Sequence, residues 1–413
     1  MDKIIYLSKI PCTTKDVQAS NLSIANETEG LISIKTTDVN GFLPLLKGDN
    51  RGTALFCVDE DNTYCTYPDC IMSPASHSRI NSSIITATKS IVCTSTQTGR
   101  NYETKYKIKS FSYHHDALNE IYQIPHQEFS KDLNDKYIQI KAVKELASNL
   151  GIITYKKSKL TCAHKMRNSY TPDGSNALEI RYDSYLEFTC SKALKFEDVM
   201  DICHKLDAVM HLMTSTQRRF SNIEFIDADD YSYSYKDLEQ IKENNTYTSR
   251  IRLIEGLNKK SIVKLLDTLL LMNDNAIFPI VEYTRRQSLE IQFLELYRTL
   301  EYIEPLVTKD KEDSTFLMNY FKTYTAEVKK IFGPNVQLWK LVFELKKIRN
   351  KYSHDGYFLG KITLEHREKK QKWTVTVDSE YLKKAVTLLR TIMYTVIYQK
   401  SQISPLPKGM PEN

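Results

Sequence analysis

The sequence predicts an α+β protein of more than one domain, with a β-rich N-terminal domain followed by an all-α helical bundle. Three observations predict this class. The chain has 413 residues, which is more than one ordinary domain holds. Hydrophobic residues make up 41% and charged residues 26%, as in a folded globular protein. The apolar residues alternate in much of the first half and follow helical spacing in the second.

Short runs rich in β-branched and aromatic residues, separated by polar turns, predict the strands of the first half. Residues 105–113 alternate in the way that is typical of a half-buried strand. The predicted strands are residues 4–7, 31–35, 54–58, 84–93, 106–111, 137–140, 152–155, 178–188 and 223–226. The first predicted helix, residues 196–213, carries its apolar residues on one stripe. Residues 227–250 are polar and rich in tyrosine, which predicts a linker.

The second half reads as helical. Apolar stripes predict helices at residues 257–272, 280–303, 315–332 and 338–352, and a closing helix that Asp378 caps. A β-hairpin is expected before this last helix. The elements together predict an N-terminal domain at 1–220, a linker and connecting helix at 221–278, a helical bundle at 279–400 and a tail at 401–413.

The positive charge of the chain is concentrated near its C-terminal end. The formal net charge is +6, but residues 336–400 alone hold 14 Lys or Arg and 6 Asp or Glu. Localised positive charge favours a polyanionic partner, and a solvated lysine-rich helix face is the ordinary alternative.

Several classes of protein are not expected. No apolar run reaches the ~18 residues of a membrane span, and the N-terminal segment lacks the pattern of a signal or transit peptide. Scattered cysteines without such a signal predict reduced thiols and a cytoplasmic location. The Cys65/Cys70 pair, the Cys162/His164 pair and the exposed polar residues expected at 114–116 and 126 are too isolated to predict a metal site. We expect neither metal nor cofactor.

One constellation carries chemistry. The helix at 338–352 ends in Arg349-Asn350-Lys-Tyr-Ser-His354. This segment resembles the R-N-x-x-x-H form of the motif of HEPN domains, helical bundles that often act as metal-independent ribonucleases. Residues 293–301 resemble the first long helix of these bundles. With its β-rich first half, the chain resembles the ApeA-type anti-phage proteins.

The resemblance implies a role for each residue of the motif. RNA is cut without metal when its own 2′-hydroxyl attacks the neighbouring phosphorus, a step that needs a proton transfer near neutral pH. His354 is the expected general acid or base, and Arg349 the group that holds the charge developing on the phosphate oxygens. Asn350 would orient the histidine or the phosphate. Lys346, Lys347 and Lys351 are the expected RNA contacts.

The resemblance also implies partners. One Arg/His pair lacks a second proton-transfer group, so two chains are expected to form a homodimer through the C-terminal bundle. The implied substrate is RNA, with tRNA as a candidate, and a phage-derived trigger would act on the N-terminal domain. The alternative is a non-catalytic HEPN module that binds RNA or a partner protein. In that case Arg349 could cap helix carbonyls, Asn350 could end the helix and His354 could be a surface residue.

Overall fold

The computed structural model describes the strands of the first 93 residues by their backbone and most of the later chain with its side chains. The later residues that it describes are 106–122, 129–130, 139–140, 148–172, 178–246, 251–272, 274, 277, 280, 288–303, 315–355, 359–366 and 370–404. Expectations for residues 126, 304–305 and 405–413 lie outside the described residues. None of the helices among the described residues is both long and apolar enough to cross a membrane.

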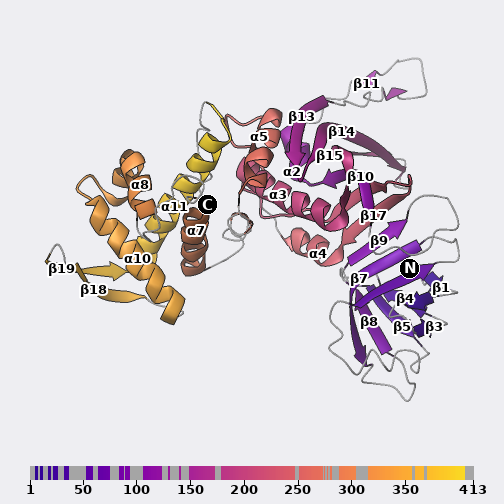
Figure 1. Cartoon of the computed structure of the whole chain (residues 1–413), viewed down its shortest axis with the longest axis horizontal. Helices are drawn as coiled ribbons and strands as arrows, with labels where there is room; N and C mark the ends of the chain where they lie inside the picture. Colours follow the sequence, from indigo (N-terminus) through magenta and orange to yellow (C-terminus); the bar gives the residue numbers. More distant parts are fainter. Residues whose placement is uncertain are drawn as a thin grey trace. The chain divides into compact units, whose positions relative to one another are not determined.

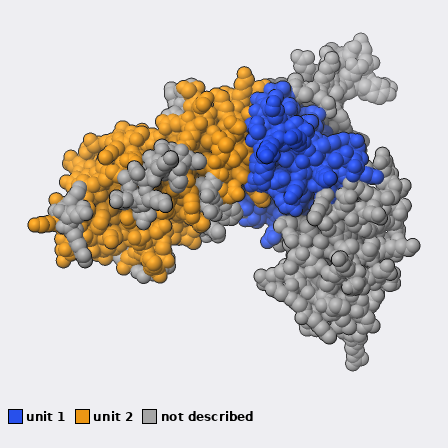
Figure 2. All heavy atoms as spheres, in the orientation of Figure 1, with its two compact units in different colours: residues 1–203, 218–251 blue, residues 204–217, 252–413 orange. Residues whose placement is uncertain are grey.

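The chain forms two compact units, which Figure 2 shows in different colours. The first comprises Met1–Cys203 and Arg218–Ile251, and the second comprises His204–Gln217 and Arg252–Asn413. An antiparallel sheet dominates the first unit and helices dominate the second. The predicted α+β class with more than one domain is therefore confirmed.

The sheet of the first unit has thirteen strands, and each pairing between its neighbouring strands is antiparallel (Figure 1). Its order is β1-β4-β5-β8-β7-β9-β17-β16-β10-β15-β14-β13, and β6 pairs with β7. The bounds are β1 Ile5–Leu7, β4 Leu22–Asn26, β5 Ile32–Thr36, β6 Thr53–Val58, β7 Tyr64–Pro74, β8 Ser83–Ala87, β9 Lys89–Cys93, β10 Lys107–His114, β13 Ser148–Tyr155, β14 Ser158–Pro172, β15 Leu178–Lys195, β16 Asn222–Asp227 and β17 Ser232–Asp237. Two small two-stranded sheets pair β2 Ile10–Cys12 with β3 Val17–Ala19 and β11 Phe129–Ser130 with β12 Gln139–Ile140.

One face of this sheet packs on helix α3, Phe196–Thr214. The Phe196 ring contacts the rings of Phe225 on β16 and Tyr235 on β17. On β16 the buried residues are Ile223, Phe225 and Asp227, and the residues between them are half-buried. Because successive side chains of a strand point to opposite faces, this burial pattern assigns one face to the core and leaves the other open. The short helix α2, Ala117–Tyr122, follows β10.

Several sequence expectations for the first unit are wrong. Residues 232–246, expected within a linker, form β17 and helix α4, Leu238–Thr246, and β17 lies inside the sheet. The tyrosines that made the segment look irregular alternate along β17, where Tyr233 and Tyr235 are buried. We also expected no strand over β14, because its residues are mostly polar. The structure buries every second one of them from Ser158 to Met166.

The second unit holds the C-terminal helices. Their bounds are α5 Lys259–Leu270, α7 Leu289–Ile303, α8 Thr315–Thr323, α9 Thr325–Phe332, α10 Leu338–Asp355 and α11 Ser379–Lys400. A hairpin of β18 Gly360–His366 and β19 Gln371–Val377 lies between α10 and α11 in the chain. The single helix expected at 315–332 is divided at Tyr324 into α8 and α9. The expected cap is confirmed, since the Asp378 carboxylate accepts the Tyr381 N–H at 2.8 Å.

Helix α3 begins in the first unit and ends in the second, where it contacts α11. His211 is fully buried, and its Nδ1 lies 2.8 Å from the Thr216 carbonyl oxygen. Because a carbonyl only accepts, Nδ1 carries the hydrogen, and Nε2 accepts from the Tyr394 hydroxyl at 2.9 Å. The Tyr398 hydroxyl donates to the Leu212 carbonyl oxygen. These contacts fix residues 204–217 to the C-terminal helix.

The buried imidazole predicts a pH-dependent stability. Burial lowers the pKa of His211 to about 4, below the ~6.5 of an unfolded chain. Between these values the unfolded state binds more protons, so His211 lowers the free energy of unfolding as the pH decreases from about 6.5 to about 4, by at most ~1.4 kcal/mol per pH unit for this one group. His211→Asn keeps a donor near the Nδ1 position and should flatten this dependence. The measurement is the melting temperature across this pH range.

The exposed His204 lies on the same helix, and His204→Asn is therefore the control. It should retain the pH dependence of the wild type. Equal pH dependence of wild type and His211→Asn would show that His211 does not bring it about.

Candidate functional site

Helix α10 carries the predicted motif on an amphipathic frame. Its buried stripe confirms the expected helix face and consists of Leu341, Val342, Glu344, Leu345, Ile348 and Tyr352. Tyr352 contacts the Phe293 ring of α7 edge to face, which fixes the last turns of α10 against α7. Glu344 is a buried carboxylate that accepts from the Trp373 Nε1 at 2.7 Å and the Tyr381 hydroxyl at 2.8 Å. The frame therefore also contacts the hairpin and α11.

Arg349 lies at the edge of this buried stripe, one turn after Leu345. Its side chain is 38% exposed. One guanidinium nitrogen, Nη2, lies 3.2 Å from the Glu301 Oε2 of α7, and the guanidinium carbon lies 5.8 Å from the centre of the Tyr297 ring. Tyr297 and Glu301 are four residues apart and so lie on one face of α7. That face holds the guanidinium in place and leaves more than a third of the side chain in solvent.

Asn350 and His354 complete the motif on the outer side of α10. The Arg349 Nη1 donates to the Asn350 Oδ1 at 3.1 Å. His354 follows Asn350 by four residues, in the last turn of the helix, and is exposed. Side chains at this spacing are neighbours on a helix surface, so Asn350 lies between Arg349 and His354. The structure thus brings the three predicted catalytic residues to one end of one helix.

The predicted RNA-binding lysines all lie on α10, but along two different faces of this helix. Lys347, Lys351 and His354 are spaced by four and three residues and share a face of α10. Lys347 is exposed, and its Nζ lies 5.4 Å from the centre of the Phe343 ring. Lys346 is half-buried and precedes Asn350 by four residues. Positive charge therefore borders the motif along α10.

The sequence analysis missed the two α7 residues that hold Arg349. Glu301 and Tyr297 lie within residues 293–301, which were assigned only as a helix. A spacing of four residues beside the apolar stripe of α7 could have indicated them. This spacing places the Glu301 carboxylate and the Tyr297 ring on one face of α7, the face that contacts Arg349 of α10. Without knowing which helices touch, the sequence offers no reason to pair Glu301 with Arg349.

Of the other residues weighed as metal ligands, Cys162, His164, His114 and His115 have described side chains, and those of Cys65, Cys70 and His126 lie outside the described residues. Cys162 and His164 are both buried, two residues apart on β14. His114 and His115 are buried as well, so the expectation of exposed residues after a strand is wrong: β10 continues to His114, and His115 accepts from the Ala117 N–H. Within the described part of the chain, no three His, Cys, Asp or Glu side chains gather as metal ligands.

A comparison with known families adds the decisive observation. The family model described as ApeA N-terminal domain 1 matches residues 4–276, well over half of the chain. The chain belongs to the ApeA family. This confirms the resemblance to the ApeA-type anti-phage proteins.

The ApeA match covers the whole sheet, α3, α4 and α5. It ends before α7 and α10, so it does not include the Arg349 motif. No curated protein and no solved structure matches the chain significantly.

The geometry predicts how far the motif contributes to stability. Arg349 forms one partly exposed ion pair, so Arg349→Ala should lower the free energy of unfolding by less than ~1 kcal/mol. The preceding residue, Ile348, is 1% exposed, and Ile348→Ala should cost about 2–5 kcal/mol. Thermal or urea denaturation measures both. Equal losses for the two variants would show that Arg349 is a core residue rather than an available group.

Proposed function

We propose that this ApeA protein is a metal-independent endoribonuclease of the HEPN type, which cuts RNA as a growth-arresting anti-phage effector. The observation that carries the proposal is the arrangement of Arg349, Asn350 and His354 at the end of α10. The α7 residues Glu301 and Tyr297 position the guanidinium without burying it, and His354 stands in solvent beside Asn350. A positioned cation and an accessible imidazole at one end of one helix are groups that the cleavage of a phosphodiester can use.

The proposed reaction uses only groups of the RNA and of the protein. The 2′-oxygen forms a bond to the adjacent phosphorus and gives up its proton to a base. The bond from phosphorus to the 5′-oxygen breaks, and that oxygen takes a proton from an acid. The products are a 2′,3′-cyclic phosphate and a 5′-hydroxyl. Arg349 would stabilise the negative charge on the non-bridging oxygens, because its planar fork can donate to two of them.

The two proton transfers favour a dimer. They occur on opposite sides of the phosphorus, whereas the motif supplies one imidazole. In the proposed enzyme two C-terminal bundles face each other, so that two His354 side chains share one composite site. The lysines of α10 would attract the phosphates of the RNA, with tRNA as the candidate substrate. A phage-derived trigger would act through the N-terminal unit.

A non-catalytic role is the second candidate, and one observation favours it. Arg349 already has a carboxylate partner in Glu301 and an amide partner in Asn350, as an arginine that takes no part in catalysis would. In this case the basic line along α10 would bind RNA or a partner protein without cutting it. The two candidates differ in their response to substitution of His354.

The catalytic candidate predicts a specific pattern of losses. His354→Ala and Arg349→Ala should each lower RNA cleavage by two orders of magnitude or more, with folding nearly intact. Arg349→Lys should rescue poorly, because a point charge cannot replace the planar fork. Lys361→Ala, an exposed site on β18, is the control and should cut RNA normally. The measurement is the cleavage of bulk RNA by purified protein, and in cells the sequencing of RNA with 5′-hydroxyl ends.

The same experiment separates the two candidates. Cleavage should persist in EDTA, and the fragments should end in a cyclic phosphate. A binding module would cut nothing as wild type; Arg349→Ala would weaken its affinity for RNA, and His354→Ala would change that affinity little. Activity that EDTA removes and magnesium or zinc restores would contradict the proposed mechanism.

The dimer makes a prediction of its own. If two motifs form one site, a mixture of His354→Ala and wild-type chains should lose activity faster than the wild-type fraction falls. Dilution should lower the specific activity of the wild type as dimers dissociate. Analytical ultracentrifugation at the same concentrations gives the oligomeric state. Full specific activity of a monomer would refute the composite site.

A further inference from the structure

The open face of the sheet in the first unit holds a hollow that the proposed RNA chemistry does not use. Its volume is about 370 Å³, within the range of small-molecule sites. Strands β10, β14, β15, β16 and β17 contribute its lining. The polar side chains that matter are the hydroxyls of Ser110, Ser112 and Ser232, the carboxylates of Glu187 and Glu224, and the guanidinium of Arg167.

Strand register places Ser112 between the two carboxylates. On β10, Ser112 is directly opposite Glu187 of β15 on one side and Glu224 of β16 on the other. Directly opposed residues share a face and have Cβ atoms about 5 Å apart. The short serine side chain therefore leaves a notch between two longer acidic ones. Among the described residues, no hydrogen bond occupies the hydroxyls of Ser110, Ser112 or Ser232.

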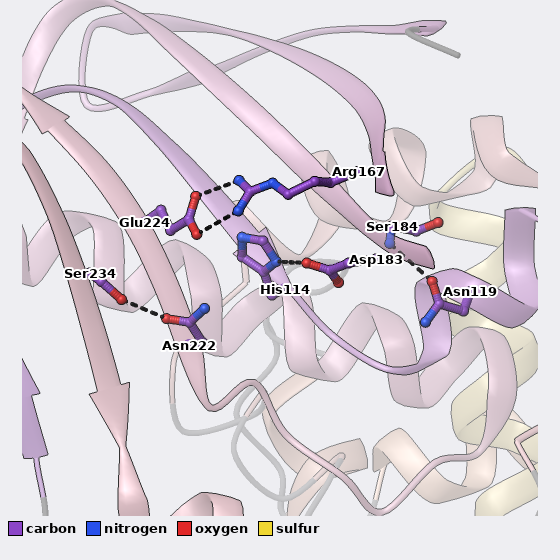
Figure 3. A network of polar contacts seen from close by, with 8 residues as sticks. All are labelled: His114, Asn119, Arg167, Asp183, Ser184, Asn222, Glu224 and Ser234. Atoms are coloured by element: carbon purple, nitrogen blue, oxygen red, sulfur yellow. Dashed lines mark hydrogen bonds and ion pairs between the residues drawn. The ribbon is translucent and has the colours of Figure 1, made fainter. Parts of the chain in front are cut away.

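An arginine bridges the hollow. Arg167 on β14 forms two hydrogen bonds to Glu224 on β16, at 3.1 and 2.8 Å (Figure 3). Strands β15 and β10 lie between these two strands, so the pair passes over both of them. The Arg167 guanidinium lies 5.4 Å from the centre of the Tyr185 ring, which also stacks on His114. Hydrogen bonding from Arg167 lowers the pKa of Glu224, which keeps this carboxylate an acceptor at neutral pH.

A buried histidine nitrogen lies beside this bridge. The His114 Nδ1 lies 2.9 Å from Asp183 Oδ2. The His114 Nε2 is buried, and no hydrogen bond to it exists in the described part of the chain. Figure 3 shows the His114 ring between Asp183 and the Arg167–Glu224 pair, with Nε2 turned toward that pair. A buried polar atom without a partner costs free energy, so this nitrogen marks a strained polar layer directly behind the hollow, although His114 itself does not line it.

The charges indicate the class of ligand. Each carboxylate has a cation beside it, because Arg167 pairs with Glu224 and Lys165 pairs with Glu187 at 2.8 Å. An anion would meet two carboxylates, and a cation would have to displace Arg167. A neutral molecule with hydroxyl groups is neither repelled by the carboxylates nor required to displace Arg167. Its hydroxyls can donate to the carboxylates and accept from the serine hydroxyls and Arg167. Carboxylates recognise ribose hydroxyls in this way in dinucleotide-binding proteins.

We propose that this hollow binds a neutral ligand that carries a vicinal diol, either the ribose of a nucleoside or a free sugar ring. The diol would donate to Glu187 and Glu224 across the notch at Ser112. The site lies within the region that matches the ApeA family, and it is independent of the Arg349 motif.

Calorimetric titration of the full chain tests the proposal. The probes are ribonucleosides, their 2′-deoxy analogues, their 5′-monophosphates, and hexoses, each up to ~10 mM, which covers millimolar affinities. A ribonucleoside or a hexose should bind, and which of the two binds identifies the source of the diol. If a nucleoside binds, its deoxy analogue should bind at least tenfold more weakly, since it leaves the polar groups of the site unpaired.

Two variants locate the site. Ser112→Val fills the notch with a residue that suits a strand, and Glu224→Gln removes one acceptor charge and the bridge. Both should weaken binding at least tenfold, and Lys156→Gln, which breaks the ion pair with Asp198 outside the hollow, should not. No binding by any probe, binding of the phosphorylated probes alone, equal binding of the deoxy analogues, or undiminished binding by both variants would each overturn the proposal. RNA cleavage does not enter this titration, so its outcome leaves the proposed nuclease untouched.

Discussion

The packing of α3 on one face of the sheet is the constraint on which the first unit depends. Phe196 contacts Phe225 and Tyr235, and these aromatic rings fix which face of β16 and β17 is the core. Because successive side chains of a strand point to opposite faces of the sheet, the residues between these core residues must point away from the core. Ser112, Glu224 and their neighbours must lie on the opposite face. The packing of α3 that forms the core on one face of the sheet therefore also determines which residues form the polar, hollowed surface on the opposite face.

The second unit uses helical periodicity for a similar purpose. The stripe of α10 buries Ile348 and Tyr352 against its neighbours, and Arg349 therefore falls at the edge of the contact with α7. There Glu301 and Tyr297 hold the guanidinium of Arg349. His354, four positions after Asn350, is exposed to solvent. The edge of a helix–helix contact thus gives Arg349 both a fixed position and access to solvent, which the proposed nuclease site would require.

Local patterns made much of this predictable. Apolar spacing identified α3, α10 and α11, the Asp378 cap follows from one residue type, and the motif at 349–354 is contiguous in the chain. The hollow in the sheet could not be predicted from the sequence, because its lining residues come from five strands and no local pattern specifies the register between those strands. Strand β14 was not predicted because polar residues such as Lys165 and Arg167 make its sequence look like a loop. In the structure these same residues form the polar face of the sheet.

Helix α3 bears on how proteins of this kind can diversify. Its first turns belong to the N-terminal unit, while residues from His204 onward belong to the C-terminal one, where His211 meets Tyr394 and Leu212 meets Tyr398. The family match likewise continues past this point, to residue 276. A recombination event that joined a different C-terminal domain at the unit boundary would cut through α3 and leave the buried His211 without Tyr394. Exchange of the C-terminal unit in evolution would therefore have to carry residues 204–217 together with their contacts on α11.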